Sequence, residues 1–243
     1  MNIREATLED DKELQDLQAK CPQGKTLIVS LVNTPDFFAR AKAYESYRVY
    51  VACDDHRIIS SAACGMRQAF IKGSLRRVGY EFQYFTSPDY RGKGIAKQLH
   101  KQIVDYLTQQ GAVLSYLLVM EGNLPAMRLF ASLGFEHHCA LVMPGLAIYK
   151  EMKVAHEEKM WCLIPIGFKD PDHLTMLLRY LNNRALARGV EQIFCIGERN
   201  HPFLTRCMKE FVRFDTNMHL YVKSLQQHVS LSDAPVYVNG IDL

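Results

Sequence analysis

Residues 85–96 constrain the fold of this chain more than any other stretch of its sequence. An extended segment ends at Pro88, and a turn containing Gly92 and Gly94 follows it. Apolar residues then recur four positions apart, at Ile95, Leu99, Ile103 and Leu107. This spacing places them on one face of an α-helix. The stretch therefore predicts a strand, a glycine turn and the N-terminus of a helix in direct succession.

Such a turn is suited to hold an anion. Glycines let consecutive backbone N–H groups converge without a Cβ atom in the way, and the helix dipole adds about half a positive charge. Arg91 and Lys93 place full positive charges beside it. The local pattern predicts a site for a phosphate or a pyrophosphate group.

Composition limits the class of protein. Among the 243 residues, 29 Lys and Arg stand against 26 Asp and Glu, and no basic run is interleaved with aromatic residues, so we expect no nucleic-acid partner. The seven cysteines are scattered without a C-x-x-C pair, which indicates free thiols in a reducing compartment. No stretch approaches the roughly 18 apolar residues of a membrane span, and the N-terminus has no signal-peptide pattern. We therefore expect a cytoplasmic protein without a membrane partner.

Periodicity and turn residues predict alternating strands and helices up to residue 150. Helices are expected after Thr7, from Pro35 to Tyr44, over 94–110 and over 124–133, the last with Asn123 as its N-cap. Residues 20–34 are ambiguous between strand and helix. Strands are expected over 1–7, 48–53, 57–71, 75–86, 113–120, 139–143 and 146–150.

The polar segment 150–159 is the expected domain boundary, because the order of elements restarts beyond it. We expect a strand over 160–168, a helix that begins at Asp170-Pro171 and ends at Gly189, and further elements over 193–196, 202–211, 219–225 and 236–238. Three landmarks of the first part of the chain recur 77 to 79 residues later: a glycine that ends a helix, an Asn-x-Pro segment and a phenylalanine. This recurrence favours an internal duplication. The second copy has no Arg-Gly-Lys-Gly segment, so it is expected to serve as structure or as a wall of the substrate site, and not as a second active site.

The sequence resembles the GNAT superfamily of acyl-CoA-dependent N-acetyltransferases. The family signature Gln/Arg-x-x-Gly-x-Gly/Ala is met by Arg91 to Ala96, and the family's usual Asn-x-x-Ala-x-x-Leu-Tyr-x-x-x-Gly-Phe segment is met, except at Phe130, by Asn123 to Phe135. The resemblance implies an α/β (α+β) fold with a mixed, mostly antiparallel sheet flanked by helices. Residues 1–150 would form this acetyltransferase domain, and residues 151–243 a degenerate, partial second copy.

The resemblance also implies a cofactor site for acetyl-CoA. Strands 76–86 and 113–120 would diverge, and the pantetheine arm of the cofactor would lie between them. The residues expected to bind it are Phe85, Thr86, Ser87, Arg91, Gly92, Lys93, Gly94, Ile95, Ala96 and Asn123. The alternatives from the residues alone remain a plain helix start at 91–96 and a simple helix cap at Asn123.

The resemblance further implies that Glu81 takes the proton from the attacking amine. A partly buried carboxylate suits a general base. The other interpretation of Glu81 is an ordinary strand residue that faces solvent or pairs with Arg76 or Arg77.

Phe130 departs from the family pattern, because the family usually has there a tyrosine that protonates the departing thiolate. Phenylalanine has no proton to give. Tyr84, Tyr116 and Tyr149 are the candidates for a substitute, although a thiol with a pKa of about 8.5 already leaves readily.

These observations predict an N-acetyltransferase in which a primary amine attacks acetyl-CoA directly. Backbone N–H groups near Phe85 and Thr86, where we expect a bulge, would stabilise the oxyanion. One alternative is a non-catalytic acyl-CoA sensor or scaffold, and another is a site for a different phosphorylated ligand. The acceptor is left open between a small molecule and a peptide, and a homodimer is left open too.

No metal is expected, since His137 and His138, being adjacent on a strand, point to opposite faces.

Overall fold

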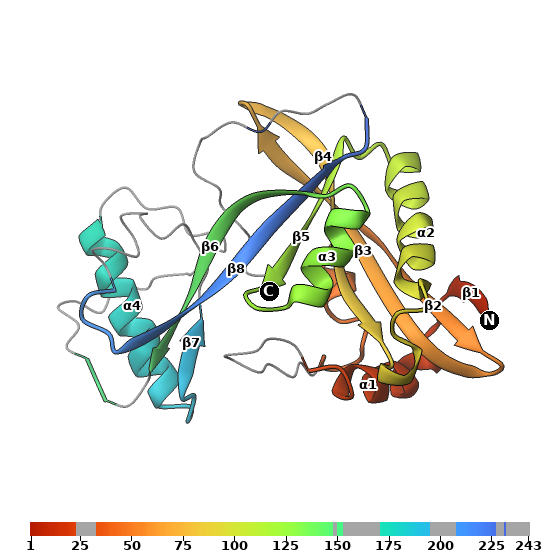
Figure 1. Ribbon diagram of the computed structural model, residues 1–243. Helices are drawn as coiled ribbons and strands as arrows, with labels where there is room; N and C mark the ends of the chain where they lie inside the picture. Colours follow the sequence, from red (N-terminus) through yellow and green to blue (C-terminus); the bar gives the residue numbers. More distant parts are fainter. Residues whose placement is uncertain (23–32, 148–149, 153–170, 195–207, 227–230, 232–243) are drawn as a thin grey trace. The chain divides into compact units, whose positions relative to one another are not determined.

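The computed structural model describes residues 1–22, 33–147, 150–152, 171–194, 208–226 and 231 of the chain (Figure 1). The chain divides into two compact units, and each is made of two separate segments. The first unit is Met1–Cys139 with His219–Asp233, and the second is Ala140–Met218 with Ala234–Leu243. The boundary expected near residue 150 therefore falls inside the second unit.

The described elements alternate as the sequence predicts for an α/β fold. In chain order they are β1 (Asn2–Glu5), η1 (Leu8–Asp10), α1 (Asp11–Ala19), η2 (Ala41–Ala43), β2 (Ser46–Asp54), β3 (Arg57–Ile71), β4 (Ser74–Thr86), η3 (Pro88–Tyr90), α2 (Ile95–Gln109), β5 (Leu114–Met120), α3 (Leu124–Ser132), β6 (Glu136–Ala147), α4 (Pro171–Leu186), β7 (Gln192–Phe194) and β8 (Arg213–Ser224). The η elements are short 3-10 helices.

The strands are hydrogen-bonded in the order β1-β2-β3-β4-β5-β8-β6-β7. The pairs β1–β2, β2–β3, β3–β4 and β6–β7 are antiparallel, and β4–β5 is parallel. The sheet is thus mixed and mostly antiparallel, which confirms the expected fold class.

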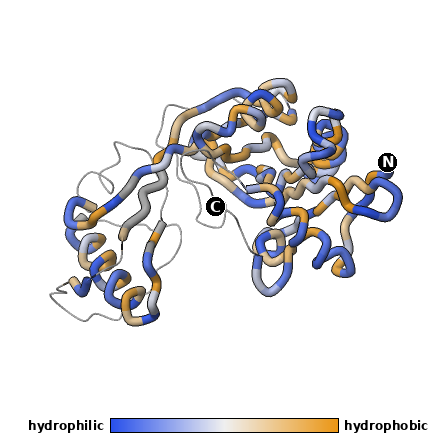
Figure 2. Tube along the Cα trace, turned by 60° about the horizontal axis from the view of Figure 1, so that its bottom comes forward, coloured by the Kyte–Doolittle hydropathy of each residue, from blue (hydrophilic) through white to orange (hydrophobic). Residues whose placement is uncertain are grey.

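In the first unit, helices cover both faces of the sheet. Alternate residues of a strand point to opposite faces, so one strand can supply apolar side chains to the cores on both sides. Val49 and Val51 of β2 lie in a buried cluster with α1, whereas Ala52 lies in a cluster with α2. Val119 of β5 lies in a further cluster on the α2 face, with Phe130 of α3. Figure 2 shows that hydrophobic and hydrophilic stretches are interspersed along the chain.

Helix α2 confirms the prediction made from its apolar spacing. Ile95, Leu99, Ile103 and Leu107 are all buried against the sheet. Gly79 of β4 lets the helix come close, because a Cβ atom there would lie 2.5 Å from Cδ1 of Leu107. The position of α2 above β4 thus depends on a residue without a side chain.

Gly79→Ala is therefore expected to lower the free energy of unfolding by about 1–3 kcal/mol, the usual cost of overpacking a core. Chemical denaturation of this variant measures the loss. Ser74→Ala, at the exposed start of the same strand, is the matched control and should leave stability unchanged within about 0.5 kcal/mol. Equal stability of the two variants would contradict the close packing.

Two local predictions were wrong. The helix expected from Pro35 to Tyr44 is reduced to the 3-10 helix η2, although Phe37, Phe38 and Ala41 are buried as the pattern requires. A short helix is marginal by itself, and here burial of the aromatic rings decides the backbone path.

The two strands expected around residues 144–145 form one strand, β6. Pairing with β7 begins at Gly145, so the missing N–H of Pro144 interrupts no bond of that pair.

In the second unit, α4 packs its apolar face into a small core of its own. Leu174, Leu177 and Leu178 are buried with Val142 and Met208. The helix predicted to begin at Asp170-Pro171 and end at Gly189 is confirmed, as is a strand near residue 193. The elements expected over 160–168 and 236–238 lie outside the described residues, and so does most of the helix expected over 202–211. The internal duplication stays a prediction.

Candidate functional site

The strands β4 and β5 begin side by side and then separate. Their parallel pairing covers Val78↔Leu114, Gly79↔Ser115 and Tyr80↔Tyr116. Within the described residues no further pair joins them, although β4 continues to Thr86 and β5 to Met120. The divergence predicted for these two strands is confirmed, and it leaves backbone groups of both strands facing a gap.

A bulge in β4 reorients the side chains next to this gap. Across β3 and β4, Ser61 pairs with Phe85 and Ala63 pairs with Phe82, so that two residues of β4 face one residue of β3. Gln83, at φ 53°, is one of these two. Residues three apart on a regular strand point to opposite faces, but the bulge brings Glu81 and Tyr84 to the same face. It lies slightly before the expected position at Phe85 and Thr86.

The turn after β4 presents the N-terminus of α2 to the same gap. Gly92 and Gly94 have φ angles of +77° and +75°, which a residue with a side chain rarely adopts. Gly94 is the N-cap of α2 and makes no side-chain capping bond. The first N–H groups of α2 have no partner within the helix. With the helix dipole, they form a site that favours an anion.

Side chains on both sides of the turn hold it in place. The guanidinium of Arg91 donates from Nε to the carbonyl oxygen of Thr86 at 3.2 Å. The hydroxyl of Tyr90 donates to Asp54 at 2.9 Å, and the ammonium of Lys93 lies 4.5 Å from the centre of the Tyr90 ring. The turn is thus tied both to β4 and to the hairpin between β2 and β3.

A pocket of about 730 Å³ opens over this turn. Eight of the ten residues predicted to bind the cofactor line it: Phe85, Thr86, Arg91, Gly92, Gly94, Ile95, Ala96 and Asn123. Ser87 and Lys93 do not. The N–H of Ser87 donates to Ile59 in the neighbouring strand at 2.9 Å, and Lys93 lies against Tyr90.

Asn123 caps a helix and also lies at the pocket. It is the N-cap of α3, where its side-chain oxygen accepts a bond from the N–H of Ala126 at 3.4 Å, and it also lines the pocket. The helix that it caps provides pocket residues that the sequence reasoning missed, at helical spacing: Pro125, Arg128, Leu129 and Ser132. Positions 3, 4 and 7 along a helix share one face, and this spacing was the signal available in the sequence.

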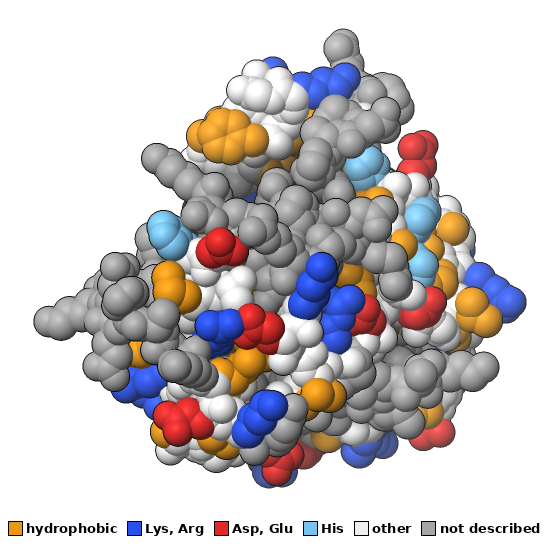
Figure 3. All heavy atoms as spheres, turned by 90° about the vertical axis from the view of Figure 1, so that its left-hand side faces the viewer, with side chains coloured by type: hydrophobic (Ala, Val, Ile, Leu, Met, Phe, Trp, Pro, Cys, Tyr) orange, Lys and Arg blue, Asp and Glu red, His pale blue; other side chains and the backbone are white. Residues whose placement is uncertain are grey.

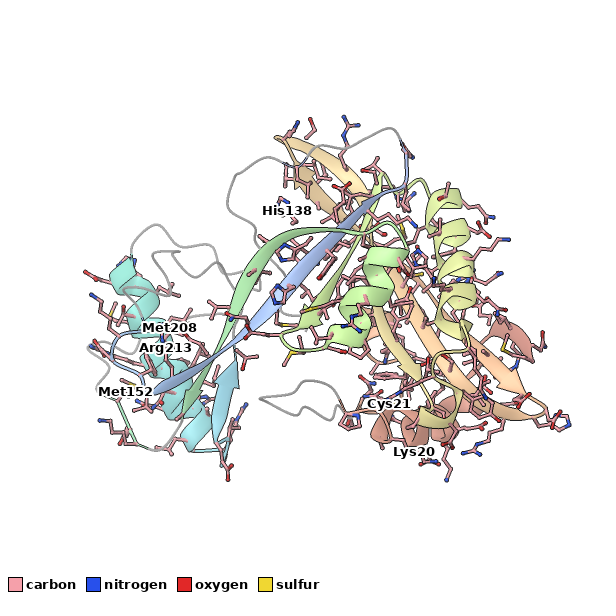
Figure 4. All side chains as sticks on the ribbon, in the orientation of Figure 1. Lys20, Cys21, His138, Met152, Met208 and Arg213 are labelled. Atoms are coloured by element: carbon pink, nitrogen blue, oxygen red, sulfur yellow. The ribbon has the colours of Figure 1, made fainter. Side chains whose placement is uncertain are left out.

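Cys21 and Pro22, which follow α1, line the pocket from another side (Cys21 is labelled in Figure 4). The thiol of Cys21 is buried, and its Sγ atom lies 3.4 Å from the carbonyl oxygen of Thr86. Sequence spacing gave no indication of this contact, because the two residues are brought together by the fold alone.

The pocket has a one-sided charge. Its described lining includes Arg91, Lys97 and Arg128 but no Asp or Glu. On the face of the molecule drawn in Figure 3, by contrast, cationic and acidic side chains are interspersed. Three cations beside a helix N-terminus suit a ligand with several phosphate groups.

Glu81, the predicted general base, lies just beyond the last paired residues of β4 and β5. It is 2% exposed and is absent from the described pocket lining. Its Oε2 atom accepts the hydroxyl of Tyr84 at 2.6 Å and lies 3.0 Å from Nδ1 of His100 on α2. Among the described residues, its Oε1 atom has no hydrogen-bond partner. Neither Arg76 nor Arg77 pairs with it in the described contacts.

Tyr84 connects this buried carboxylate to the pocket, because it is a lining residue of the pocket and its hydroxyl contacts Glu81. Burial raises the pKa of Tyr84 well above its usual 10, and the charge and hydrogen bond of Glu81 raise it further. The hydroxyl therefore stays protonated and donates to Glu81.

Phe130 is buried and lies outside the described lining of the pocket. Its ring meets the Tyr84 ring edge-on, with 5.1 Å between the centroids.

Of the three tyrosines considered as substitutes, Tyr84 lines the pocket. Tyr116 accepts a bond from Arg67 on the opposite face of the sheet, at 3.1 Å. Tyr149 lies outside the described residues.

His137 faces His219 of β8, with 3.1 Å between Nε2 and Nδ1, and its neighbour His138 is labelled in Figure 4. In the part of the chain that the structure describes, no three His, Cys, Asp or Glu side chains gather as metal ligands. Over the same residues, no helix has the length and hydropathy that a membrane crossing requires.

Comparison with known proteins assigns the family. The family model described as the acetyltransferase (GNAT) family matches residues 12–135, slightly more than half of the chain. No curated protein matches the chain.

Solved structures of low sequence identity share the fold. Protein smu.2055 from Streptococcus mutans is 12% identical, with a TM-score of 0.53 over 93% of this chain and 100% of that one. A putative acetyltransferase from Salmonella typhimurium, yncA, solved with its cofactor acetyl-CoA, is 15% identical, with a TM-score of 0.52 over 96% and 99%. An N-acetyltransferase from Staphylococcus aureus is 12% identical, with a TM-score of 0.50 over 93% and 98%.

Proposed function

Because this chain belongs to the acetyltransferase (GNAT) family, we propose that it transfers an acetyl group from acetyl-CoA to a primary amine of a small molecule or peptide. The observation that carries this proposal is the pocket at the N-terminus of α2, where β4 and β5 separate. A cytoplasmic location is part of the proposal, and the free thiols of Cys21, Cys53 and Cys64 fit a reducing compartment.

The chain's own groups would hold acetyl-CoA along its length. The N–H groups that follow Gly92 and Gly94 would receive the pyrophosphate, while Arg91, Lys97 and Arg128 would balance the phosphate charges. The pantetheine arm would lie between β4 and β5, with its amides paired to the backbone near Phe85 and Thr86. The thioester end would then lie toward the point where the strands join, which is also where Glu81 lies.

Transfer requires a neutral amine, because an ammonium has no lone pair for attack. The amine nitrogen bonds to the thioester carbon, the carbon–sulfur bond breaks, and the amine proton passes to Glu81. Since Glu81 is absent from the described lining, we expect the proton to reach its Oε1 atom through a water molecule. The departing sulfur, whose thiol has a pKa of about 8.5, leaves as a thiolate.

A second candidate function follows from Phe130. Phenylalanine has no proton to give at the position where the family usually has a tyrosine. A chain that binds acetyl-CoA without using it would act as a sensor or scaffold.

Thiol release from acetyl-CoA with a panel of amines separates the two functions. The panel should include amino acids, polyamines, aminoglycosides and peptides with free N-termini or lysines. We expect release with one of these classes, at a rate above the amine-free control. Tight binding of acetyl-CoA by calorimetry without release on any class would favour the sensor and overturn the enzyme.

A further inference from the structure

Four polar side chains from three elements of the first unit form a row beside the pocket, in which Glu81 and His100 are buried and Lys223 and Tyr84 are partly buried. The row runs from Lys223 on β8 to His100 on α2 and then to Glu81 and Tyr84 on β4. Nζ of Lys223 lies 3.1 Å from Nε2 of His100, and Nδ1 of His100 lies 3.0 Å from Oε2 of Glu81. Tyr84, which lines the pocket, donates to the same Oε2 at 2.6 Å.

The chemistry of these groups gives the row one direction. An ammonium can only donate, so Nε2 of His100 must accept from Lys223. An imidazole that accepts at Nε2 carries its proton on Nδ1, which lies 3.0 Å from Oε2 of Glu81 and 3.2 Å from the hydroxyl of Tyr84. Because that hydroxyl itself donates to Glu81, Nδ1 donates to the carboxylate. Glu81 then receives two bonds at Oε2, while its Oε1 atom is left without a partner among the described residues.

The charges in the row balance. Burial lowers the pKa of Lys223 below its usual value, and the negative charge of Glu81 acts in the opposite sense and favours the ammonium. Cys64 lies directly across from Glu81 on β3, and burial raises the pKa of this thiol well above its usual value, so it stays neutral. The ring of Phe135 covers His100, with 5.5 Å between the centroids. Lys223 is thus the cation that faces Glu81 through His100.

Lys223 lies outside the residues 12–135 that the family model matches. It reaches the site because β8 lies next to β5 in the sheet, between β5 and β6. The C-terminal part of the chain therefore contributes directly to the surroundings of the predicted base.

We propose that Lys223 is a positioning residue that fixes the Nδ1–H tautomer of His100 and thereby keeps the Glu81 carboxylate oriented, with Oε1 open to a proton. The tautomer assignment stands on the contacts alone, whereas its effect on catalysis rests on the proposed function. Without the ammonium, His100 is free to carry its proton on Nε2. Its Nδ1 lone pair would then face the carboxylate and compete with it for the hydroxyl of Tyr84, 3.2 Å away, so Glu81 would lose the bond that orients it.

Nitrogen NMR of protein with ¹⁵N-labelled histidine tests the tautomer directly, and the His100 signals are identified by their loss in His100→Gln. We expect Nδ1–H in the unmodified chain and a change in Lys223→Met. Lys223→Arg should keep Nδ1–H because it keeps a charged donor. Lys101→Met, which removes an exposed lysine next to His100 in sequence, is the matched control and should change nothing. An Nε2–H tautomer in the unmodified chain, or no change in Lys223→Met, would overturn the proposal.

Activity on the best amine provides the second readout. Lys223→Met should lower kcat about tenfold, a part of the roughly 10²–10⁴-fold that acid–base catalysis supplies, with KM for acetyl-CoA within about twofold. Lys223→Arg, which keeps a charged donor to His100, should restore most of kcat. A tautomer change without any effect on kcat would contradict the catalytic part.

Lys223→Gln separates the orienting effect of Lys223 on His100 from the effect of its positive charge. It also replaces Lys223→Met in these tests if that variant does not fold. Its amide can donate to Nε2 of His100 but carries no charge. It should keep the Nδ1–H tautomer and, because the proposal gives Lys223 an orienting role, most of kcat. If the tautomer responds as expected but the unmodified chain acetylates no amine, the inference about Lys223 stands and the proposed function fails.

Discussion

Glu81→Gln is expected to lower kcat for amine acetylation by about 10²–10⁴-fold, the usual contribution of a general base. The amide keeps the size of the side chain and an oxygen that accepts from Tyr84, but it cannot take a proton from the amine. Because Glu81 is absent from the described pocket lining, Kd for acetyl-CoA should stay within about twofold of the unmodified value. Steady-state kinetics and calorimetry measure the two quantities.

Glu13→Gln is the matched control for this variant. Glu13 on α1 also holds a hydrogen bond inside the first unit, since it accepts the N–H of Ile58 at 2.7 Å, but it lies outside the row that contains Glu81. It should lose some stability and keep kcat. If Glu81→Gln lowers the melting temperature and leaves kcat unchanged, Glu81 is a structural residue and the proposed base is wrong.

Gly94→Val is expected to weaken acetyl-CoA binding by at least about tenfold, which corresponds to 1.4 kcal/mol. At φ +75°, a β-branched residue forces the turn to change its backbone, and the N–H groups that follow would no longer converge on the pyrophosphate. The strain should also cost about 1–3 kcal/mol of unfolding free energy. Calorimetry with acetyl-CoA and chemical denaturation measure the two effects.

Gly111→Val at the other end of α2 isolates the effect on the ligand. Gly111 has a φ of +78°, and an added Cβ atom meets nothing within 4 Å at either glycine. Both variants should therefore lose similar stability, and only Gly94→Val should lose affinity for acetyl-CoA. Equal affinities would mean that the turn does not hold the cofactor.

Local features of the fold were predictable because neighbouring residues decide them. The apolar spacing from Ile95 to Leu107 predicted α2, and the glycine positions predicted the turn before it. Asn123 followed by a proline in the first turn predicted the start of α3. Each of these depends on residues within about one helical turn, where backbone propensity and capping act.

Features that join distant parts of the chain were not predictable in the same way. The contacts of Glu81 with His100 and, through it, with Lys223 bring together three elements that no sequence spacing relates. The bulge at Gln83, which turns Tyr84 to the face of Glu81, has no glycine to mark it. The insertion of β8 beside β5 likewise depends on sheet pairing over a separation of about a hundred residues. Tertiary packing decides all three.

Calorimetric titration with acetyl-CoA tests the central claim, that the pocket at the N-terminus of α2 is an acyl-CoA site. We predict one site per chain, with binding that also raises the melting temperature, because a ligand at 100 times its Kd stabilises the folded state by about 2.7 kcal/mol. The Gly94→Val variant should lose this signal and Gly111→Val should keep it. No heat and no thermal shift with acetyl-CoA or CoA, together with a shift from another phosphorylated compound, would contradict the claim and assign the pocket to a different ligand.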